Sequence, residues 1–372
     1  MATNTLAQNI SKNMNRFHIS LLSLALLASI LYSCSKGSVP YTQNGNWVYR
    51  GDFNGAARSE AVSFVVGNNA YVGTGIDNSF NRYNDFWQLT VNGNNCSWFQ
   101  VASATSMTPR NSAVAFSVSG QGYVGSGTNG TTAFNDFWHY NPETNGWNQI
   151  ASLGDSINGP APRFDGVGFG IESVGKGYVG TGNNYTQYLK DFWEYDPTTD
   201  TWTSKVSYDG TKRTAAISFV YNNQAYLVTG LGTGGVVVND FWKFDPSKPD
   251  SSAWTQLRHI TNFSPDSYDD SYTTIARYNG VGFVMTGVKT DGGGDKAYIS
   301  TGINGSLMTW TWEYDFVNDL WTEKTPFERS ARQGAVGFTL QNRGFVALGI
   351  SGATNFEDLN EWHPDEVYNQ QD

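Results

Sequence analysis

Residues 71–75 (YVGTG), followed by residues 85–87 (DFW), decide the fold of this chain. Close copies of both segments return at 123–127 (YVGSG) and 136–138, at 178–182 (YVGTG) and 191–193, and at 226–230 (YLVTG) and 240–242. The copies lie roughly fifty residues apart, a period that is typical of propellers, solenoids and other repeat architectures. The chain is therefore built from repeated units.

Each unit contains four short apolar runs that are separated by turn sequences. The turns include Gly67-Asn68-Asn69, residues 141–145 (NPETN) and residues 196–200 (DPTTD). Such turns join antiparallel strands into hairpins. Four antiparallel strands in each of six units predict an all-β, six-bladed β-propeller.

The fifth and sixth units depart from the pattern. In the fifth unit, Asp270 stands where the other units have Arg, and residues 283–287 (FVMTG) are aligned as its second strand. The sixth unit ends before a fourth-strand Trp. Trp47 stands eleven residues before Arg58, the same spacing that separates Trp202 from Arg213 and Trp321 from Arg332. The segment around Trp47 is therefore predicted to close the ring as the outer strand of the last blade, which removes open sheet edges.

The repeated order of Arg, Phe, Tyr-Val-Gly-Thr-Gly, Asn-Asp-Phe-Trp, Tyr-Asp-Pro and Trp resembles kelch repeats, from residue 47 to about residue 364. The resemblance departs from the family at one place, because the kelch Gly-Gly doublet is here Thr-Gly, Ser-Gly or, in the last unit, Leu348-Gly349. It implies a kelch-type propeller whose loops after the second strand and between blades open on one face. The motif is specific for the fold and not for a function.

Bulky aromatic rings are expected between the blades, because both faces of each blade are buried against its neighbours. The predicted inter-blade core includes Trp87, Trp138, Trp193, Trp242 and Trp312. Burial of each ring contributes roughly 2–3 kcal/mol.

Arg and Asp recur together in five units, and both are missing from the fifth unit as aligned. Strands one and three run in the same direction, so the two residues lie at the same end of a blade. The predicted structural ion pairs are Arg58–Asp85, Arg110–Asp136, Arg163–Asp191, Arg213–Asp240 and Arg332–Asp358. The alternative is that the five arginines form a ring around the channel mouth that binds a carboxylate or a sialic-acid-like ligand.

The variable loops are the predicted binding surface, since variable loops on a rigid scaffold usually carry function. They place aromatic side chains beside many Asn, Thr and Ser, which suits stacking on a glycan or contact with a protein. The candidate residues are Tyr83, Tyr185, Tyr188, Tyr268 and Tyr298, and the fifth-blade loop is placed at residues 288–309. The alternative for each is that it packs its own loop. Asp266, Asp269 and Asp270 match no calcium loop and are expected to be a solvated acidic run.

Enzymatic alternatives remain open. Galactose-oxidase-like kelch enzymes hold copper on two His and two Tyr, but His139 occupies a repeat position that takes many polar residues and is expected to face solvent. Six-bladed sialic acid mutarotases fit the length and blade number, although their catalytic residues have no assigned counterpart here. No metal site or cofactor is expected, and no catalytic residue is assigned. The net charge of −10 and the absence of basic clusters argue against nucleic-acid binding.

The N-terminus resembles that of a bacterial lipoprotein. Residues 19–31 form an apolar run that fits a signal peptide, and residues 31–34 (LYSC) resemble a lipobox in which Cys34 is lipidated after cleavage. The predicted organisation is a signal peptide over 1–34, a polar tether over 35–46, the propeller over 47–368 and a tail over 369–372. Taken together, the sequence predicts a non-catalytic, lipid-anchored module of the bacterial cell envelope that binds a glycan or a protein, with a sugar-processing enzyme of mutarotase type as the alternative.

Overall fold

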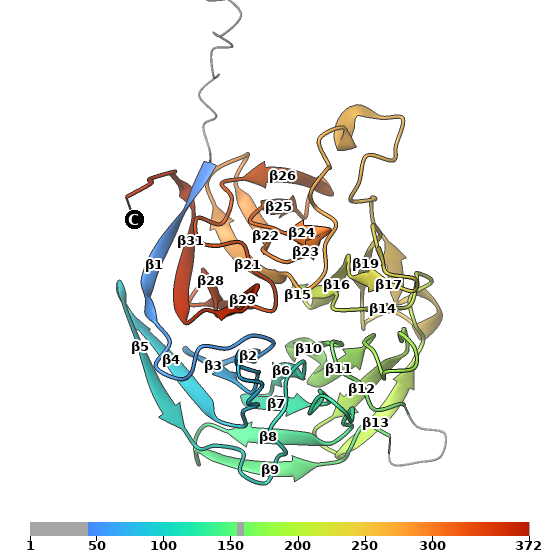
Figure 1. Cartoon of the computed structure of the whole chain (residues 1–372). Coiled ribbons are helices and arrows are strands. Elements are labelled where there is room, and N and C mark those ends of the chain that lie inside the picture. Colours follow the sequence, from blue (N-terminus) through green and yellow to red (C-terminus); the bar gives the residue numbers. More distant parts are fainter. Residues whose placement is uncertain (1–43, 155–159, 372) are drawn as a thin grey trace, which may run out of the picture. The chain divides into compact units, whose positions relative to one another are not determined.

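The computed structural model describes residues 44–154 and 160–371, and these form six four-stranded antiparallel sheets set around a central axis (Figure 1). Within the described residues, no helix is long and apolar enough to cross a membrane. The predicted signal peptide, the lipidation site at Cys34 and nearly all of the predicted tether lie outside the described residues. The six-bladed propeller that the repeats predict is confirmed.

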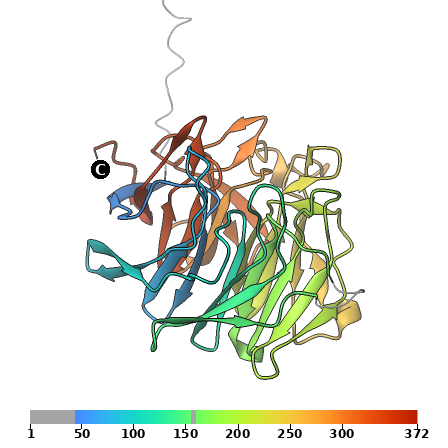
Figure 2. The ribbon, with the colours of Figure 1, turned by 60° about the horizontal axis from the view of Figure 1, so that its bottom comes forward.

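Each of the first three blades is one continuous stretch of chain, with its first strand nearest the axis (Figure 1), and Figure 2 shows their sheets side by side in a tilted view. Blade 1 consists of β2 (Val62–Val66), β3 (Asn69–Gly73), β4 (Phe86–Asn92) and β5 (Asn95–Val101). Blade 2 consists of β6 (Val114–Val118), β7 (Gln121–Gly125), β8 (Phe137–Asn141) and β9 (Gly146–Ile150). Blade 3 consists of β10 (Val167–Ile171), β11 (Lys176–Gly180), β12 (Phe192–Asp196) and β13 (Thr201–Lys205).

The remaining three blades follow the same order, with short additional strands in their loops. Blade 4 consists of β15 (Ile217–Tyr221), β16 (Gln224–Val228), β19 (Phe241–Phe244) and β20 (Trp254–Gln256). Blade 5 consists of β21 (Val281–Val288), β22 (Gly294–Ser300), β25 (Thr311–Asp315) and β26 (Leu320–Lys324). Blade 6 consists of β27 (Val336–Leu340), β28 (Arg343–Ala347), β31 (Asp358–Val367) and β1 (Asn44–Asp52). The additional strands are β14 (Arg213–Thr214), β17 (Leu231–Gly232), β18 (Val236–Val237), β23 (Ile303–Asn304), β24 (Ser306–Leu307), β29 (Ile350–Ser351) and β30 (Thr354–Asn355), and three 3-10 helices are η1 (Glu172–Val174), η2 (Asp250–Ser252) and η3 (Ser267–Asp269).

The ring closes through β1, as the sequence predicts. β1 pairs antiparallel with β31, and Trp47 lies opposite Trp362. The two indole rings are 5.0 Å apart, and Trp47 is also 5.0 Å from the ring of Phe327 and only 2% exposed. The first strand of the described chain is thus bound to the last by both a backbone ladder and an aromatic core.

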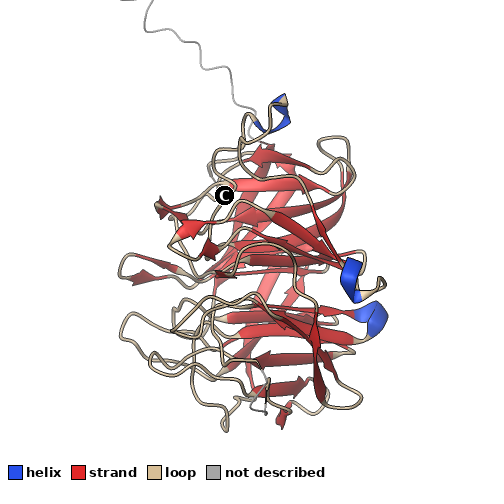
Figure 3. Ribbon diagram, turned by 90° about the vertical axis from the view of Figure 1, so that its right-hand side faces the viewer, coloured by secondary structure: helices blue, strands red, loops and turns tan. Residues whose placement is uncertain are grey.

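The two ends of the propeller differ in character. We call one end the loop face; it carries the loops between the second and third strands and the connections between blades. The other end, the hairpin face, carries the turns that join strands one to two and three to four. Figure 3 views the sheets edge-on, with the long loops gathered on the left. Ligand access to the axis is therefore bounded by long loops at one end and by short turns at the other.

The aromatic core lies between neighbouring blades. The Phe of each DFW triplet is fully buried, and the deepest rings are Phe86, Phe137, Phe192 and Phe241. Of the tryptophans predicted for this core, Trp138, Trp242 and Trp312 are buried, whereas Trp87 and Trp193 are half-buried. Phe64 of the first strand stacks on Tyr71 of the second at 5.1 Å, and every other blade has the same kind of pair. These stacks explain why aromatic residues recur at fixed strand positions.

Blade 5 corrects the sequence alignment. Phe283 lies in the first strand, β21, and pairs with Tyr298 in β22. Residues 298–302 (YISTG) are therefore the second-strand segment, and residues 283–287 are not. The fifth-blade loop accordingly begins after β22, so the range 288–309 was wrong. The alignment failed because the β21–β22 hairpin contains an insertion with an irregular register.

Two residues of blade 5 were misassigned as a consequence. Arg277, which is fully buried, precedes the first strand in the place given to Asp270. Tyr298 is fully buried in β22 and stacks on Phe283 at 5.6 Å, so it is not a loop aromatic.

The expectation of a solvated run at Asp266, Asp269 and Asp270 is wrong in part. Asp269 is buried and accepts hydrogen bonds from the backbone N–H groups of Phe263 and Ser264.

Candidate functional site on the loop face

Arginine and aspartate form an ion pair under the loop face of five blades, as predicted. The closest nitrogen–oxygen distances are 2.5 Å for Arg58–Asp85, 2.6 Å for Arg110–Asp136, 2.7 Å for Arg163–Asp191, 2.5 Å for Arg213–Asp240 and 2.5 Å for Arg332–Asp358. The five arginine side chains are at most 1% exposed. A ligand could reach these guanidinium groups only by displacing structural contacts, and their role in binding stays a prediction.

The aspartate of the DFW triplet also fixes the tryptophan. In blade 2, Asp136 accepts hydrogen bonds from the two terminal guanidinium nitrogens of Arg110 and from the indole N–H of Trp138, the last at 2.8 Å. Burial alone would raise the pKa of Asp136, but these donors and the guanidinium charge outweigh it and hold the pKa below its usual range. Asp191 of blade 3 has the same partners and the same direction of shift. The triplet therefore recurs because one carboxylate orients two large side chains.

Blade 5 has the arginine without the carboxylate. The guanidinium of Arg277 donates to the backbone carbonyls of Ile275, Thr301, Trp310 and Thr274, at 2.6 to 2.9 Å. Burial lowers the pKa of Arg277 to about 9. Backbone carbonyls alone thus satisfy this side chain, and the sequence signal for it was hidden by the insertion in the hairpin.

Each Thr-Gly or equivalent doublet binds the next blade. The glycine N–H donates to the backbone carbonyl of the arginine of the following blade, in the pairs Gly75–Arg110, Gly127–Arg163, Gly182–Arg213, Gly230–Arg277, Gly302–Arg332 and Gly349–Arg58, at 2.7 to 2.9 Å. These glycines have φ between 88° and 112°, and a Cβ on Gly75 would lie 2.8 Å from the carbonyl oxygen of Ser59. Glycine is required because the backbone conformation and the close approach both exclude a side chain.

A second set of contacts, which we call the inner ring, encircles the axis at the loop face. It consists of the residue two positions after each arginine: Glu60, Ser112, Asp165, Ala215, Asn279 and Gly334. Each N–H donates to the carbonyl of the preceding member, at 2.7 to 3.0 Å, and the sixth bond closes the circle. All six have φ between 52° and 61°. The sequence analysis missed the inner ring, although its constant offset from the arginine was a usable signal.

Two carboxylates lie on the inner ring. Glu60 accepts hydrogen bonds from the amide of Asn111 at 2.5 Å and from the hydroxyl of Ser112 at 2.8 Å. Burial, and after it the negative charge of Glu60, raise the pKa of Asp165 to about 7. A small cavity of about 160 Å³ is lined by the ring and by the residues that follow it. The channel mouth is therefore acidic and rich in hydrogen-bonding groups.

The predicted loop tyrosines fall into two groups. Tyr83 donates to Asp77 at 2.7 Å and lies 3.9 Å from the guanidinium of Arg58, so it packs its own loop. Tyr188 and Tyr268 are half-buried, the latter beside Arg258. Tyr185 is different: its ring is 49% exposed while its hydroxyl contacts that of Thr128 at 2.5 Å. Of these four, Tyr185 presents the largest surface to a ligand.

Sequence reasoning missed several exposed apolar side chains on the loop face. Phe263 is 70% exposed, Val236 67% and Trp310 37%, and they join Phe80 at 78% and Tyr185. All five lie in loops between the second and third strands or between blades. The sequence offered a signal for them, because they are apolar residues within otherwise polar loops.

Two of the described histidines, His139 and His363, lie in different blades. His139 is half-buried beside Tyr123 and burial lowers its pKa, so it faces solvent only in part. His363 contacts Glu361 and Glu366 on β31 of blade 6. Among residues 44–154 and 160–371, no group of three or more His, Cys, Asp or Glu side chains is placed to share a metal ion.

Comparison with known proteins agrees with the fold. A family model described as the KLHDC2/KLHL20/DRC7 Kelch-repeats domain matches residues 47–214. The comparison with curated protein sequences gave no significant match. Among solved structures, one titled "Structure of YjhT" is 17% identical, with a TM-score of 0.64 over 82% of this chain and 95% of that chain. At this identity the likeness concerns the fold alone. Residues 47–214 thus match a kelch-repeat model, and the described residues build a propeller of the kelch type.

Proposed function

We propose that this chain is a non-catalytic binding module that holds a protein partner on its loop face and is anchored to the bacterial cell envelope through a lipid on Cys34. Kelch domains generally mediate protein binding. The anchor rests on the lipobox-like residues 31–34 and on the apolar run before them.

The observation that carries the proposal is the set of exposed apolar side chains on the loop face. Phe80, Tyr185, Val236, Phe263 and Trp310 are each between 37% and 78% exposed. Aromatic side chains are enriched at the energetic centres of protein interfaces, because they bury a large area with little loss of rotamer freedom. The same loops carry many Asn, Thr and Ser side chains, which supply the hydrogen-bonding rim that such an interface needs.

Hydrogen bonds between side chains and the backbone support two of these loops, those that carry Phe80 and Tyr185. Asp77 accepts from the backbone N–H groups of Ser79 and Asn81, both at 2.8 Å, and thereby fixes the turn that exposes Phe80. Asn183 accepts from the N–H of Tyr185 at 2.7 Å. Pre-organised loops lose less conformational entropy on binding, which favours affinity.

The test compares two sets of substitutions. The combined variant Phe80→Ser, Tyr185→Ser, Phe263→Ser and Trp310→Ser removes the aromatic loop-face set, and Phe99→Ser removes a 57% exposed ring from the outer strand of blade 1 as a control. Each purified protein is immobilised and offered cell-envelope extract. A partner that binds the wild type and Phe99→Ser, but not the combined variant, would support the proposal. Equal capture by all three proteins would contradict it.

Two further measurements separate the alternatives. Selective binding to a glycan array that the combined variant loses would make the ligand a glycan in place of a protein. Acceleration of α/β anomer exchange in sugars, measured by NMR, would contradict the non-catalytic role. For the anchor, mass spectrometry should find acyl chains on Cys34, and Cys34→Ser should release the protein from the membrane fraction.

A further inference from the structure

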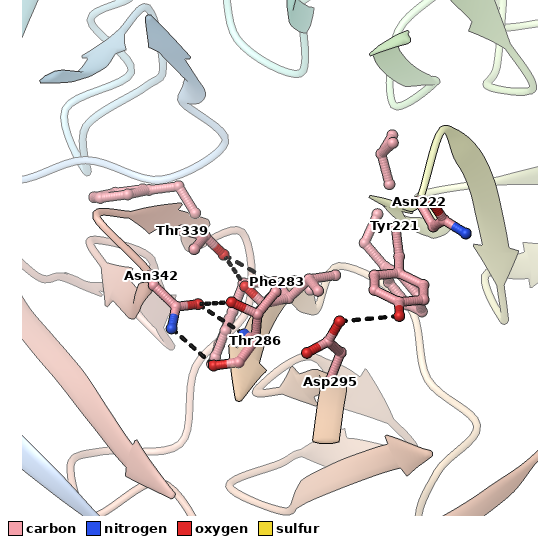
Figure 4. Close-up of a pocket in the computed structure, with 12 residues that line it drawn as sticks. Tyr221, Asn222, Phe283, Thr286, Asp295, Thr339 and Asn342 are labelled. Carbon is pink, nitrogen blue, oxygen red and sulfur yellow. Dashed lines mark hydrogen bonds between the residues drawn. The ribbon is translucent and has the colours of Figure 1, made fainter. Parts of the chain in front are cut away.

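A cavity of about 700 Å³ opens on the hairpin face, away from the proposed partner surface. It lies between the first hairpins of blades 4, 5 and 6, and Figure 4 shows Tyr221, Thr286, Asp295 and Asn342 around it. Its volume falls within the range of about 300–1,000 Å³ that is typical of small-molecule sites.

The insertion in blade 5 builds one wall of this cavity. The inserted hairpin supplies Thr286 and Asp295, and it is held in place by Asp365, which accepts from the N–H groups of Lys289 and Thr290 at 2.7 and 2.9 Å. Asp295 stands three positions before Tyr298. The residues at the same place in the other blades are neutral: Asn68, Gly120, Gly175, Asn223 and Asn342. A carboxylate at this turn is therefore a specific feature of blade 5.

Asp295 is a half-buried carboxylate in the wall of this cavity. Its oxygens accept hydrogen bonds from the hydroxyl of Tyr221 at 3.0 Å and from the N–H of Gly287 at 2.9 Å. Among the described residues, no Lys, Arg or His forms an ion pair with it, whereas the nearby Asp315 binds Lys296 at 2.8 Å. The residues that line the cavity include no basic side chain, and the whole chain carries a net charge of −10.

The remaining walls are neutral and fixed. Asn342 accepts from the backbone N–H of Thr286 at 2.7 Å and donates to its carbonyl at 2.8 Å. Tyr221 stacks on Phe316 at 3.8 Å, and burial together with the bond to Asp295 raises the pKa of its hydroxyl, which stays protonated. Val220 and Val284 contribute aliphatic surface. One anionic group thus sits beside an apolar wall in a pre-formed cavity.

We propose that this cavity binds a small organic cation, a primary amine or guanidinium carried on a short aliphatic stem. The ammonium or guanidinium N–H groups donate to the free lone pairs of Asp295, and the stem lies along Val220, Val284 and the ring of Tyr221. Charge-assisted hydrogen bonds of this kind are roughly twice as strong as neutral ones, and the cation neutralises a partly desolvated carboxylate. The site is on the opposite face from the proposed partner surface, so either proposal can fail without the other.

Titration calorimetry with 1,5-diaminopentane tests the charge requirement. The matched probe is the same molecule acetylated on both nitrogens, which keeps the stem and removes the charge. We expect the diamine to bind at least tenfold more tightly than the acetylated probe, and its affinity to fall as salt is added. Equal binding of the two probes, or no binding of the diamine at millimolar concentration, would overturn the proposal.

Substitutions locate the site. Asp295→Asn keeps the shape of the side chain and should weaken binding of the diamine tenfold or more, whereas Asp266→Asn removes an exposed charge on the loop face and should leave binding unchanged. Thermal unfolding of both variants confirms that they are folded. An equal loss in both variants would mean that the diamine senses only the overall negative charge, and unchanged binding by Asp295→Asn would place the diamine elsewhere; either outcome rejects the site.

Discussion

Arg110 and Asp136 are joined by two hydrogen bonds, of 2.6 and 2.8 Å, although the two residues precede different strands of blade 2, β6 and β8. Arg110 also donates to the carbonyl of Ser126, which precedes Gly127, and its own carbonyl accepts the N–H of Gly75 from blade 1. One side chain and its backbone therefore tie together three segments of two blades. The arginine, the aspartate and the glycine recur together in most repeats because the same arginine contacts both of the other residues.

Replacing Arg110 with lysine should destabilise the protein. Lysine keeps the charge but cannot donate from two fixed nitrogens to Asp136 and also reach Ser126, so a buried acceptor loses its partner. We expect a loss of roughly 2–3 kcal/mol in the free energy of unfolding, measured by urea denaturation. The exposed Arg258→Lys serves as control. An Arg110→Lys protein as stable as the control would show that the pair has no structural role.

How far sequence reasoning reaches is illustrated by blades 5 and 6. The sequence placed Trp47 correctly because its spacing to Arg58 is the same as that of Trp202 to Arg213. Such a spacing can be recognised even when the strand lies far along the chain from the rest of its blade. Arg277 was missed because residues 283–287, at the start of the insertion, resemble the second-strand motif. The alignment therefore took them for the second strand and placed the preceding arginine position too early in the chain. The inner ring exists only once the six blades close around the axis, so a local sequence pattern cannot predict its hydrogen bonds. The lack of an ion-pair partner for Asp295 depends likewise on which charged side chains lie nearby in the folded chain.

Ring closure by β1 should make a large contribution to stability. Trp47 is 2% exposed and packs against Trp362 and Phe327, so Trp47→Ala leaves a cavity where blade 6 is completed. We expect a cost of about 3–5 kcal/mol. Tyr49→Ala on the same strand, where the side chain is 40% exposed, should cost less than about 1 kcal/mol. Chemical denaturation compares the two, and similar costs would indicate that β1 is bound only by its backbone.

The innermost strands of blades 2 and 3 approach too closely for a side chain at Gly170. A Cβ there would lie 1.9 Å from the carbonyl oxygen of Ser117, so the two blades would have to move apart. Gly170→Ala should therefore cost roughly 1–3 kcal/mol through overpacking. Gly146→Ala is the matched control, because its nearest neighbour is the hydroxyl of Thr144 at 3.4 Å. If thermal unfolding gave equal stability for both variants, the close approach of these strands would be refuted.

Asp165 on the inner ring should make stability depend on pH. Burial and the charge of Glu60 raise its pKa to about 7, whereas the unfolded chain releases this proton near its ordinary pKa of about 4. Between these values the folded state holds a proton that the unfolded state has lost, so stability falls as the pH rises from about 4 to about 7. Asp165→Asn removes this titration.

The measurement is the difference in melting temperature between Asp165→Asn and the wild type at two pH values. The difference should be near zero at pH 4 and should favour the variant by roughly 2 °C or more at pH 8, since the wild type then carries two negative charges on the inner ring. Glu60→Gln lowers the pKa of Asp165 by removing the neighbouring charge, and it should reduce the same pH dependence. A difference that does not change between pH 4 and pH 8 would show that Asp165 is ionised across this range, and the inner ring would then tolerate two carboxylate charges without penalty.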